Sequence, residues 1–211
     1  MKSLRYIFFD IGYTLVNEDK VWEQRYREQA AGEEAKKIGL TAEQIYEEIV
    51  LASKSYLPQY RTVVKKYGFR KVAPYRHELE FLYEDANAIL EKLSETYALG
   101  IIANQTDGLM ERLREWETDR YFSMVISSWD YQVMKPDQRI FQIALEKAGC
   151  RPEEAMMVGD RLDNDIYPAK ALGMRTVWIK NGFGGMQKAV GEEYVPDYEV
   201  ESLSELLDVL C

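Results

Sequence analysis

Histidine and cysteine are scarce in this chain, and each scarcity excludes a class of function. His77 is the only histidine in 211 residues, which rules out a zinc site built on several histidines. A Ser-His-Asp arrangement would have to use His77, which lies in a polar stretch far from any predicted strand end, so we do not expect one. The two cysteines, Cys150 and Cys211, have no metal-type spacing and form no disulfide framework, which fits a reducing cytosol.

Long hydrophobic runs and positive charge are also in short supply. The apolar run near the amino terminus ends at Phe9, which is too short for a signal peptide or a membrane span. The 27 Lys and Arg against 36 Asp and Glu give a net charge of −9, which argues against nucleic acid or an anionic membrane as the main partner. Global charge does not exclude a small phosphorylated substrate. These features predict a cytoplasmic protein and leave both monomer and dimer open.

What the sequence does contain is a regular alternation of helical and strand-like segments from residue 86 onward. The expected helix and strand pairs are 86–95 with 98–103, 108–116 with 124–127, 138–148 with 155–159, and 164–172 with 175–180. A last short strand near 198–200 precedes a helix capped by Ser202. Such alternation predicts βαβ units, and therefore an α/β, doubly wound (Rossmann-like) fold around a parallel sheet.

The stretch 16–85 has no convincing strand pattern. Trp22, Tyr26 and Ala30 recur at helical spacing, and a capping box that begins at Thr41 opens a second helical period. We therefore predict a helical insertion in an α/β domain. The predicted domains are a core of residues 1–15 and 86–211, and a small all-helical cap of residues 16–85.

Several of the apolar runs end in polar side chains. Asp10, Asn104 and Asp160 each come directly after or within one residue of such a run. A carboxylate at the end of a buried strand is costly unless it is used or paired. Open α/β sheets build their sites at the carboxyl ends of their strands. These side chains therefore predict one site gathered from distant parts of the sequence.

Four separated motifs resemble those of the haloacid dehalogenase-like (HAD) hydrolase superfamily, over nearly the whole chain. The matching segments are Asp10 with Thr14 and Leu15, the strand ending at Ala103 and Asn104, Lys135 with Pro136, and Gly159-Asp160 through Asn164-Asp165. Any one of them alone is weak, but four in the family's order are specific. The stretch 16–85 resembles the family's cap inserted after the first strand.

The resemblance implies a phosphatase chemistry. Asp10 would attack phosphorus and form an aspartyl phosphate, while Lys135 would neutralise the nucleophile and the phosphoryl oxygens. Mg²⁺ would be held by Asp10, Asp160, Asp165 and the backbone carbonyl of Gly12. The candidate phosphate-binding side chains are Asn104, Gln105, Lys135 and Arg161, and Arg161 fits solvent exposure equally well.

Two positions depart from the family pattern. Gly12 stands where family phosphatases carry an aspartate that protonates the leaving group, and Ala103 stands where a hydroxyl contacts a phosphoryl oxygen. Loss of a general acid costs about 10²–10⁴ in rate, which predicts a weak or selective phosphatase. Tyr13 is adjacent, but an ordinary phenol with a pKa of about 10 is a poor base at neutral pH.

Two other functions stay open at this point. A dehalogenase-like hydrolase would attack carbon and would need neither a metal nor a general acid, although the pair Asp160 and Asp165 favours a cation. A non-catalytic module that binds Mg²⁺ and phosphate, or a partner protein, is the second alternative. The side chains missing at Gly12 and Ala103 favour it.

Overall fold

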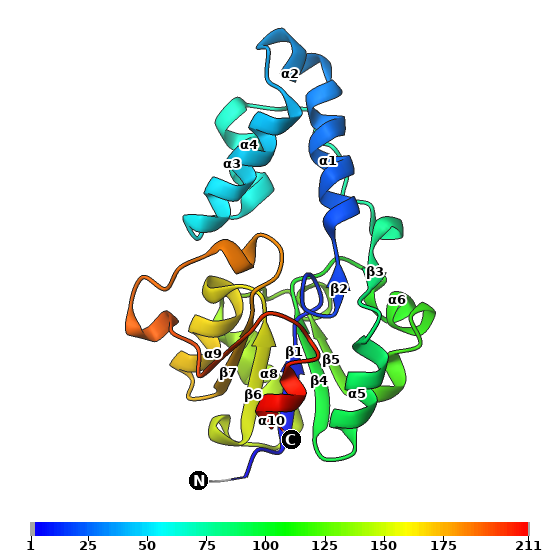
Figure 1. The fold of residues 1–211 in the computed structure, drawn as a ribbon, viewed down its shortest axis with the longest axis vertical. Coiled ribbons are helices and arrows are strands. Elements are labelled where there is room, and N and C mark those ends of the chain that lie inside the picture. Colours follow the sequence, from blue (N-terminus) through cyan, green and yellow to red (C-terminus); the bar gives the residue numbers. More distant parts are fainter. Residues whose placement is uncertain (1–2, 211) are drawn as a thin grey trace.

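The computed structural model describes residues 3–210, and a parallel sheet forms its centre. The strands of this sheet are β1 (Tyr6–Phe9), β4 (Ala98–Ala103), β5 (Phe122–Ser127), β6 (Ala155–Gly159), β7 (Arg175–Ile179) and β8 (Tyr198–Val200). Their order is β5-β4-β1-β6-β7-β8, and every neighbouring pair is parallel. The prediction of a doubly wound, Rossmann-like α/β fold is confirmed (Figure 1).

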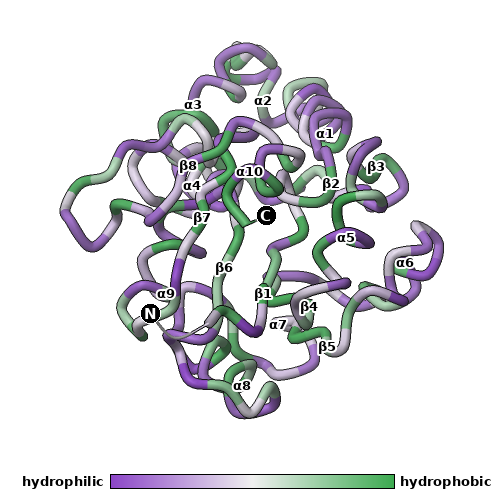
Figure 2. The backbone as a smooth tube through the Cα atoms, turned by 60° about the horizontal axis from the view of Figure 1, so that its bottom comes forward, coloured by the Kyte–Doolittle hydropathy of each residue, from purple (hydrophilic) through white to green (hydrophobic). Residues whose placement is uncertain are grey.

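Helices cover both faces of the sheet. They are α5 (Ala86–Ser94), α6 (Leu109–Glu115), α7 (Ser128–Tyr131), α8 (Gln138–Ala148), α9 (Tyr167–Ala171) and α10 (Leu206–Leu210). In β1, Ile7 and Phe9 pack in the cluster that includes α5, α6 and α10, whereas Phe8 packs against α8 and α9. A strand buried on both faces is expected to be apolar throughout, and Figure 2 shows this along β6.

The chain between β1 and α5 forms a group of helices beyond one end of the sheet (Figure 1). They are α1 (Asp19–Ala31), α2 (Glu33–Lys37), α3 (Ala42–Lys54) and α4 (Gln59–Tyr67). The capping box at Thr41 is present, because its hydroxyl accepts a hydrogen bond from the Gln44 N–H at 3.3 Å and the Gln44 side chain accepts one from the Thr41 N–H at 2.9 Å. Ile45 and Ile49 of α3 pack against Tyr60 of α4 in a separate apolar cluster.

The expectation that 16–85 contains no strand is wrong at its two ends. β2 (Val16–Asn17) pairs antiparallel with β3 (Phe81–Leu82), so the two connections between the helices and the core lie side by side. Strands this short cannot show an alternating pattern, and for that reason the sequence gives no sign of them.

Some boundaries also differ from expectation. The helix expected at 164–172 is a π-helical turn, η4 (Leu162–Ile166), followed by α9. The last helix, α10, begins four residues after Ser202, which therefore does not cap it. The 3₁₀ turns are η1 (His77–Leu79), η2 (Asp119–Tyr121), η3 (Pro152–Glu154), η5 (Gly184–Met186) and η6 (Glu192–Tyr194).

Two bulk features bear on the earlier expectations. Within residues 3–210, no helix combines the length and apolar character that a membrane crossing requires. The thiol of Cys150 is free and half-buried, while Cys211 lies outside the described residues. The prediction of a reducing compartment therefore stays a prediction.

Candidate active site

The sheet order brings the predicted polar residues together. β1 lies between β4 and β6, with Phe9 in register with Ile101 on one side and Val158 on the other. The strands that precede Asp10, Asn104 and Asp160 are thus three adjacent inner strands of the sheet. Their carboxyl ends open into one cleft of about 450 Å³, which all three residues line. This is the topological switch point where doubly wound sheets bind ligands.

Three acidic side chains converge here: Asp10 and Asp160 line the cleft, and the fully buried Asp165 lies next to them. One carboxylate oxygen from each of Asp10, Asp160 and Asp165 lies within 4.8 Å of the others. η4 places Asp165, whose Oδ2 accepts a hydrogen bond from the Arg161 N–H at 3.0 Å. A Cβ on Gly159 would lie 2.4 Å from Cγ of Asp165, so only glycine at that strand end leaves room for this carboxylate.

Lys135 sits between two of these carboxylates. Its Nζ lies 2.7 Å from Oδ1 of Asp10 and 2.5 Å from Oδ1 of Asp165, and its side chain is almost fully buried. Burial works against the charged ammonium, but the two carboxylates outweigh it and hold the pKa of Lys135 above its ordinary value. One ammonium cannot balance three carboxylates, so the cluster keeps a net negative charge.

Asp160 is the member of the acidic cluster that lacks a cationic partner in the described part of the chain. Asp160 is 4% exposed and has no ion-pair partner among residues 3–210. Burial, followed by the charges of Asp165 and Asp10, raises its pKa well above the ordinary value, and burial raises the pKa of Asp165 to about 6. A buried carboxylate without a cation is costly. The donor set, all hard oxygen atoms, therefore fits a divalent cation such as Mg²⁺.

The predicted phosphate-binding residues also line the cleft, and the side chains of Asn104 and Gln105 are engaged by neighbouring protein groups. The Asn104 amide donates to the Lys135 carbonyl at 2.9 Å and accepts from the Lys135 N–H at 2.7 Å, so it fixes the backbone that carries the lysine. Gln105 accepts a hydrogen bond from Arg112 at 2.6 Å through its side-chain oxygen. Their binding of phosphate stays a prediction.

Arg161 has both a partner and a free group. Its Nε and Nη2 donate to the two carboxylate oxygens of Asp163, at 3.0 and 2.6 Å, while Nη1 is buried without a hydrogen-bond partner. The side chain is 8% exposed and lines the cleft. The alternative of a solvent-exposed Arg161 is therefore wrong. A buried donor without an acceptor suits a phosphoryl oxygen.

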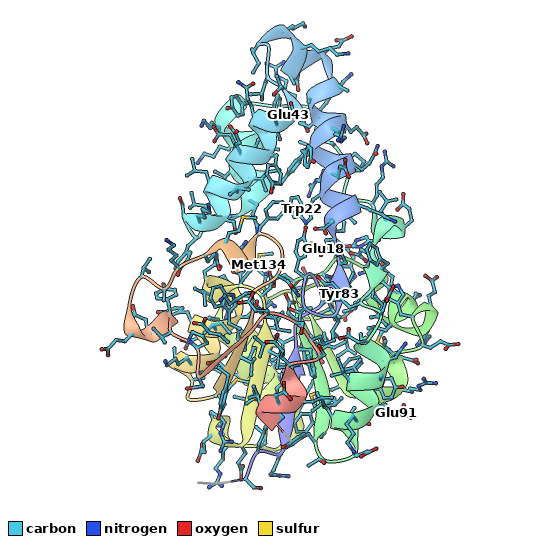
Figure 3. The ribbon with its side chains drawn as sticks, in the orientation of Figure 1. Glu18, Trp22, Glu43, Tyr83, Glu91 and Met134 are labelled. Carbon is cyan, nitrogen blue, oxygen red and sulfur yellow. The ribbon has the colours of Figure 1, made fainter. Side chains whose placement is uncertain are left out.

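Glu18 is a cleft residue that the sequence did not single out. A Cβ on Gly12 would lie 2.3 Å from Oε1 of Glu18, so the glutamate carboxyl fills the space that a side chain at position 12 would need. Its Oε2 accepts a hydrogen bond from Trp22 Nε1 at 2.8 Å. Burial raises its pKa to about 7, although hydrogen bonds from Tyr75 and Trp22 oppose the shift. Figure 3 shows Glu18 and Trp22 at the junction of helices and core.

Two further features of the cleft escaped the sequence analysis. His77 lines it and joins the segment before β3 to the core, with Nε2 2.8 Å from Thr106 Oγ1 and Nδ1 2.9 Å from Glu80 Oε1. Phe183 reaches from the loop after β7 to the rings of Tyr13 and Trp22, with centroids 5.9 and 5.1 Å apart. Neither residue lies in a periodic segment or next to a predicted motif, so the sequence carried no signal for them.

Tyr13 is excluded as a base by its surroundings. Its side chain is buried, and its hydroxyl donates to Asp19 at 3.1 Å. Burial, followed by the neighbouring charges of Asp19 and Glu18, raises the pKa of Tyr13 above its ordinary value. Deprotonation at neutral pH is therefore even less favourable than in an ordinary phenol.

Several known proteins are similar to this chain in sequence, in fold, or in both. A family model described as haloacid dehalogenase-like hydrolase matches residues 7–179. A glyceraldehyde 3-phosphate phosphatase from Pyrococcus furiosus is 32% identical over 100% of this chain and 94% of its own length. A phosphoserine phosphatase from Thermus thermophilus is 35% identical over 59% of this chain and 49% of its own. An HAD phosphatase from Thermococcus onnurineus superimposes with a TM-score of 0.65 at 29% identity, covering 98% of both chains. The chain therefore belongs to the haloacid dehalogenase-like hydrolase family, as its four motifs predicted.

Proposed function

We propose that this protein is a Mg²⁺-dependent phosphatase that hydrolyses a small phosphorylated molecule through an aspartyl phosphate. The observation that carries the proposal is the convergence of the Asp10, Asp160 and Asp165 carboxylates, with the ammonium of Lys135 in contact with Asp10 and Asp165. The names of the relatives, phosphatases of glyceraldehyde 3-phosphate and phosphoserine, support the reaction class.

The residues divide the chemistry among them. Asp10 attacks phosphorus, and Lys135 lowers the repulsion between that carboxylate and the phosphoryl oxygens. Arg161 donates its unpartnered Nη1 to one of those oxygens, while Asn104 keeps Lys135 in position. The acidic cluster and the Gly12 carbonyl would hold Mg²⁺, which would supply further charge neutralisation.

Glu18 takes the role of the side chain that position 12 lacks. It places a carboxyl oxygen in that same space, lines the cleft with Asp10, and is held by Trp22 through its other oxygen. In the first step it gives its proton to the leaving oxygen, and in the second it takes a proton from the water that attacks the aspartyl phosphate. With Glu18 as the general acid, the glycine at position 12 does not by itself make the phosphatase weak.

Residues 16–85 serve as the cap of this enzyme. The helices α1–α4 lie over the carboxyl edge of the sheet, and Ser53 of α3 donates to the Phe183 carbonyl at 2.9 Å. Glu18, Trp22 and Gln59 line the cleft from this side. Closure over a bound substrate would exclude bulk water from the phosphoryl group.

The two alternatives explain less of the site. A dehalogenase needs neither a cation nor a leaving-group acid, which leaves the buried charges of Asp160 and Glu18 without a purpose. A purely binding module does not need a nucleophile in contact with Lys135.

Phosphate release from a panel of phosphate esters, with Mg²⁺ and with a chelator, tests the proposal. We expect turnover only with the metal, a loss of at least about 10³ in kcat for Asp10→Asn, and trapping of radiolabelled phosphate on Asp10. Hydrolysis of 2-haloacids that persists in the chelator would establish the dehalogenase instead. Saturable binding of phosphate mimics without turnover of any ester would favour the binding module.

A further inference from the structure

The cap side of the cleft carries a guanidinium without an acidic partner. Among the described residues, Lys135 and Arg161 line the cleft and both contact aspartates, whereas Arg25 lines the same cleft with no carboxylate within ion-pair distance. Arg25 is half-buried. A cation that is partly removed from water loses hydration free energy, and an anionic ligand compensates for this loss.

Aromatic rings and one backbone carbonyl hold this guanidinium in place. Its Nε donates to the Ala73 carbonyl at 3.1 Å, and its carbon lies 3.7 Å from the centroid of the Tyr60 ring. The rings of Trp22 and Tyr75 lie 5.6 and 5.7 Å away. A guanidinium fixed in this way presents a planar fork of donors between flat side chains. A carboxylate matches that fork in shape and charge.

The position of Arg25 relates it to the reaction. Asp10 and Lys135 enter the cleft from the core, and Arg25 enters it from α1 of the cap. The volume of about 450 Å³ leaves room for a small molecule between these groups. A substrate with its phosphate on the core and a second acidic group on the cap would connect the two.

We infer that Arg25 is the subsite for a carboxylate of the substrate, which makes the preferred substrates small phosphorylated acids. This inference rests on the proposed function, because the phosphate end is assigned by the acidic cluster. Arg25 acts here as a specificity-determining residue: it does not touch the phosphoryl group, and its contribution appears only when the substrate carries the second acidic group.

Matched pairs of phosphate esters test the inference. Phosphoserine and phosphoethanolamine differ only by a carboxylate, as do phosphoglycolate and methyl phosphate. We expect kcat/KM to favour the carboxylate-bearing ester of each pair. We expect Arg25→Met to lower activity on these esters about 10- to 100-fold, mainly through KM, and to change activity on the esters without a carboxylate less than about threefold. Arg25→Lys keeps the charge without the fork and should lose less. Arg27→Met, on the exposed side of the same helix, is the control.

The outcomes separate this inference from the proposed function. Equal losses on both members of a pair would show that Arg25 only supports the cap, and the inference would be wrong. Calorimetry with the Asp10→Asn variant measures the same preference without turnover. Equal affinities for phosphoserine and phosphoethanolamine would overturn the subsite even if both esters are hydrolysed by the wild type. A preference for phosphoserine that Arg25→Met abolishes would support it even if neither ester is turned over.

Discussion

In the proposed mechanism, Gly12 leaves the space for a general acid and Glu18 supplies its carboxyl group. The glycine leaves a space beside the nucleophile, and the glutamate, which precedes α1, fills it from the cap side. A carboxyl there is useful only if the leaving group needs a proton. The proposed role of Glu18 as proton donor can therefore be tested by varying the leaving group of the substrate.

We predict that Glu18→Ala lowers kcat/KM about 10²–10⁴-fold for alkyl phosphates, whose alkoxide must be protonated, and less than about 10-fold for p-nitrophenyl phosphate. Gly12→Asp alone should be poorly active, because its side chain collides with Glu18. The double variant Gly12→Asp/Glu18→Ala should recover activity on alkyl phosphates. Steady-state kinetics on esters of graded leaving-group acidity measure all three variants.

A purely structural Glu18 would give a different pattern. Glu18→Ala would then slow both classes of ester equally, and Gly12→Asp would not rescue it. Glu18→Gln serves as the matched control, because the amide oxygen can still accept the hydrogen bond from Trp22 but the side chain cannot transfer a proton.

The sequence could predict some site residues and not others for a physical reason. Asp10 and Asp160 follow apolar strands directly, so their place at the sheet edge depends only on the strand pattern. The place of Glu18 depends on the turn between Asp10 and β2, in which Tyr13 has a φ of +51°. Arg25 depends on how α1 packs against Tyr60 of α4. Contacts between segments that are distant in the sequence produce no local pattern that a single sequence could show.

At the scale of elements, the loop after β7 joins the acidic cluster to the cap. A Cβ on Gly184 would lie 2.3 Å from both the carbonyl oxygen and Oδ2 of Asp160, so this turn packs directly on a proposed metal ligand. The same loop accepts the hydrogen bond from Ser53 of α3 at 2.9 Å. A change in the backbone of this turn is therefore expected to affect both the acidic cluster and the contact with α3.

We predict that Gly184→Ala destabilises the protein by about 1–3 kcal/mol, because the backbone of Asp160 cannot move away as a flexible side chain could. It should also weaken Mg²⁺ binding. Gly191→Ala is the control, since the atoms its Cβ would meet belong to the exposed side chain of Glu193, and it should change stability by less than about 0.5 kcal/mol. Urea unfolding and calorimetric titration with Mg²⁺ measure both effects. Unchanged stability and affinity in Gly184→Ala would refute the packing argument.

The elements that the sequence predicted well are those with a strong local pattern. β4, β6 and α8 have the expected bounds. The apolar run of each buried strand and the Asp137 cap with the amphipathic period of α8 mark these bounds in the local sequence. The two-residue strands and the π-helical turn η4 come from pairing and packing between distant segments. Local pattern carries no information on those.

At the scale of the whole molecule, the proposed metal site would couple folding to binding of the cation. Among the described residues, Asp10 and Asp165 share one ammonium and Asp160 has none, so part of the folding free energy is lost to the mutual repulsion of the three carboxylates. A ligand that binds only the folded state stabilises it by mass action. Mg²⁺ should therefore stabilise the protein without any substrate.

We predict that Mg²⁺ at 100 times its Kd stabilises the wild type by about 2.7 kcal/mol, which corresponds to a rise of about 5–10 °C in Tm. In Asp160→Asn the rise should disappear, while the metal-free variant should be at least as stable as the metal-free wild type because one buried charge is gone. Glu91→Gln, on the far side of the core in Figure 3, should keep the full response. A Tm of the wild type that does not respond to Mg²⁺ would contradict the proposed metal site.

The pairing of β2 with β3 brings the two ends of the 18–80 segment together, with Val16 beside Leu82 and Asn17 beside Phe81. A short turn could join those ends, which makes the insertion a unit that recombination can exchange while the sheet stays intact. In this chain such an exchange would remove Glu18 and Arg25 together, and so the proposed proton donor along with the proposed acid-recognising group. Grafting a foreign segment would therefore alter the rate on poor leaving groups as well as the choice of substrate.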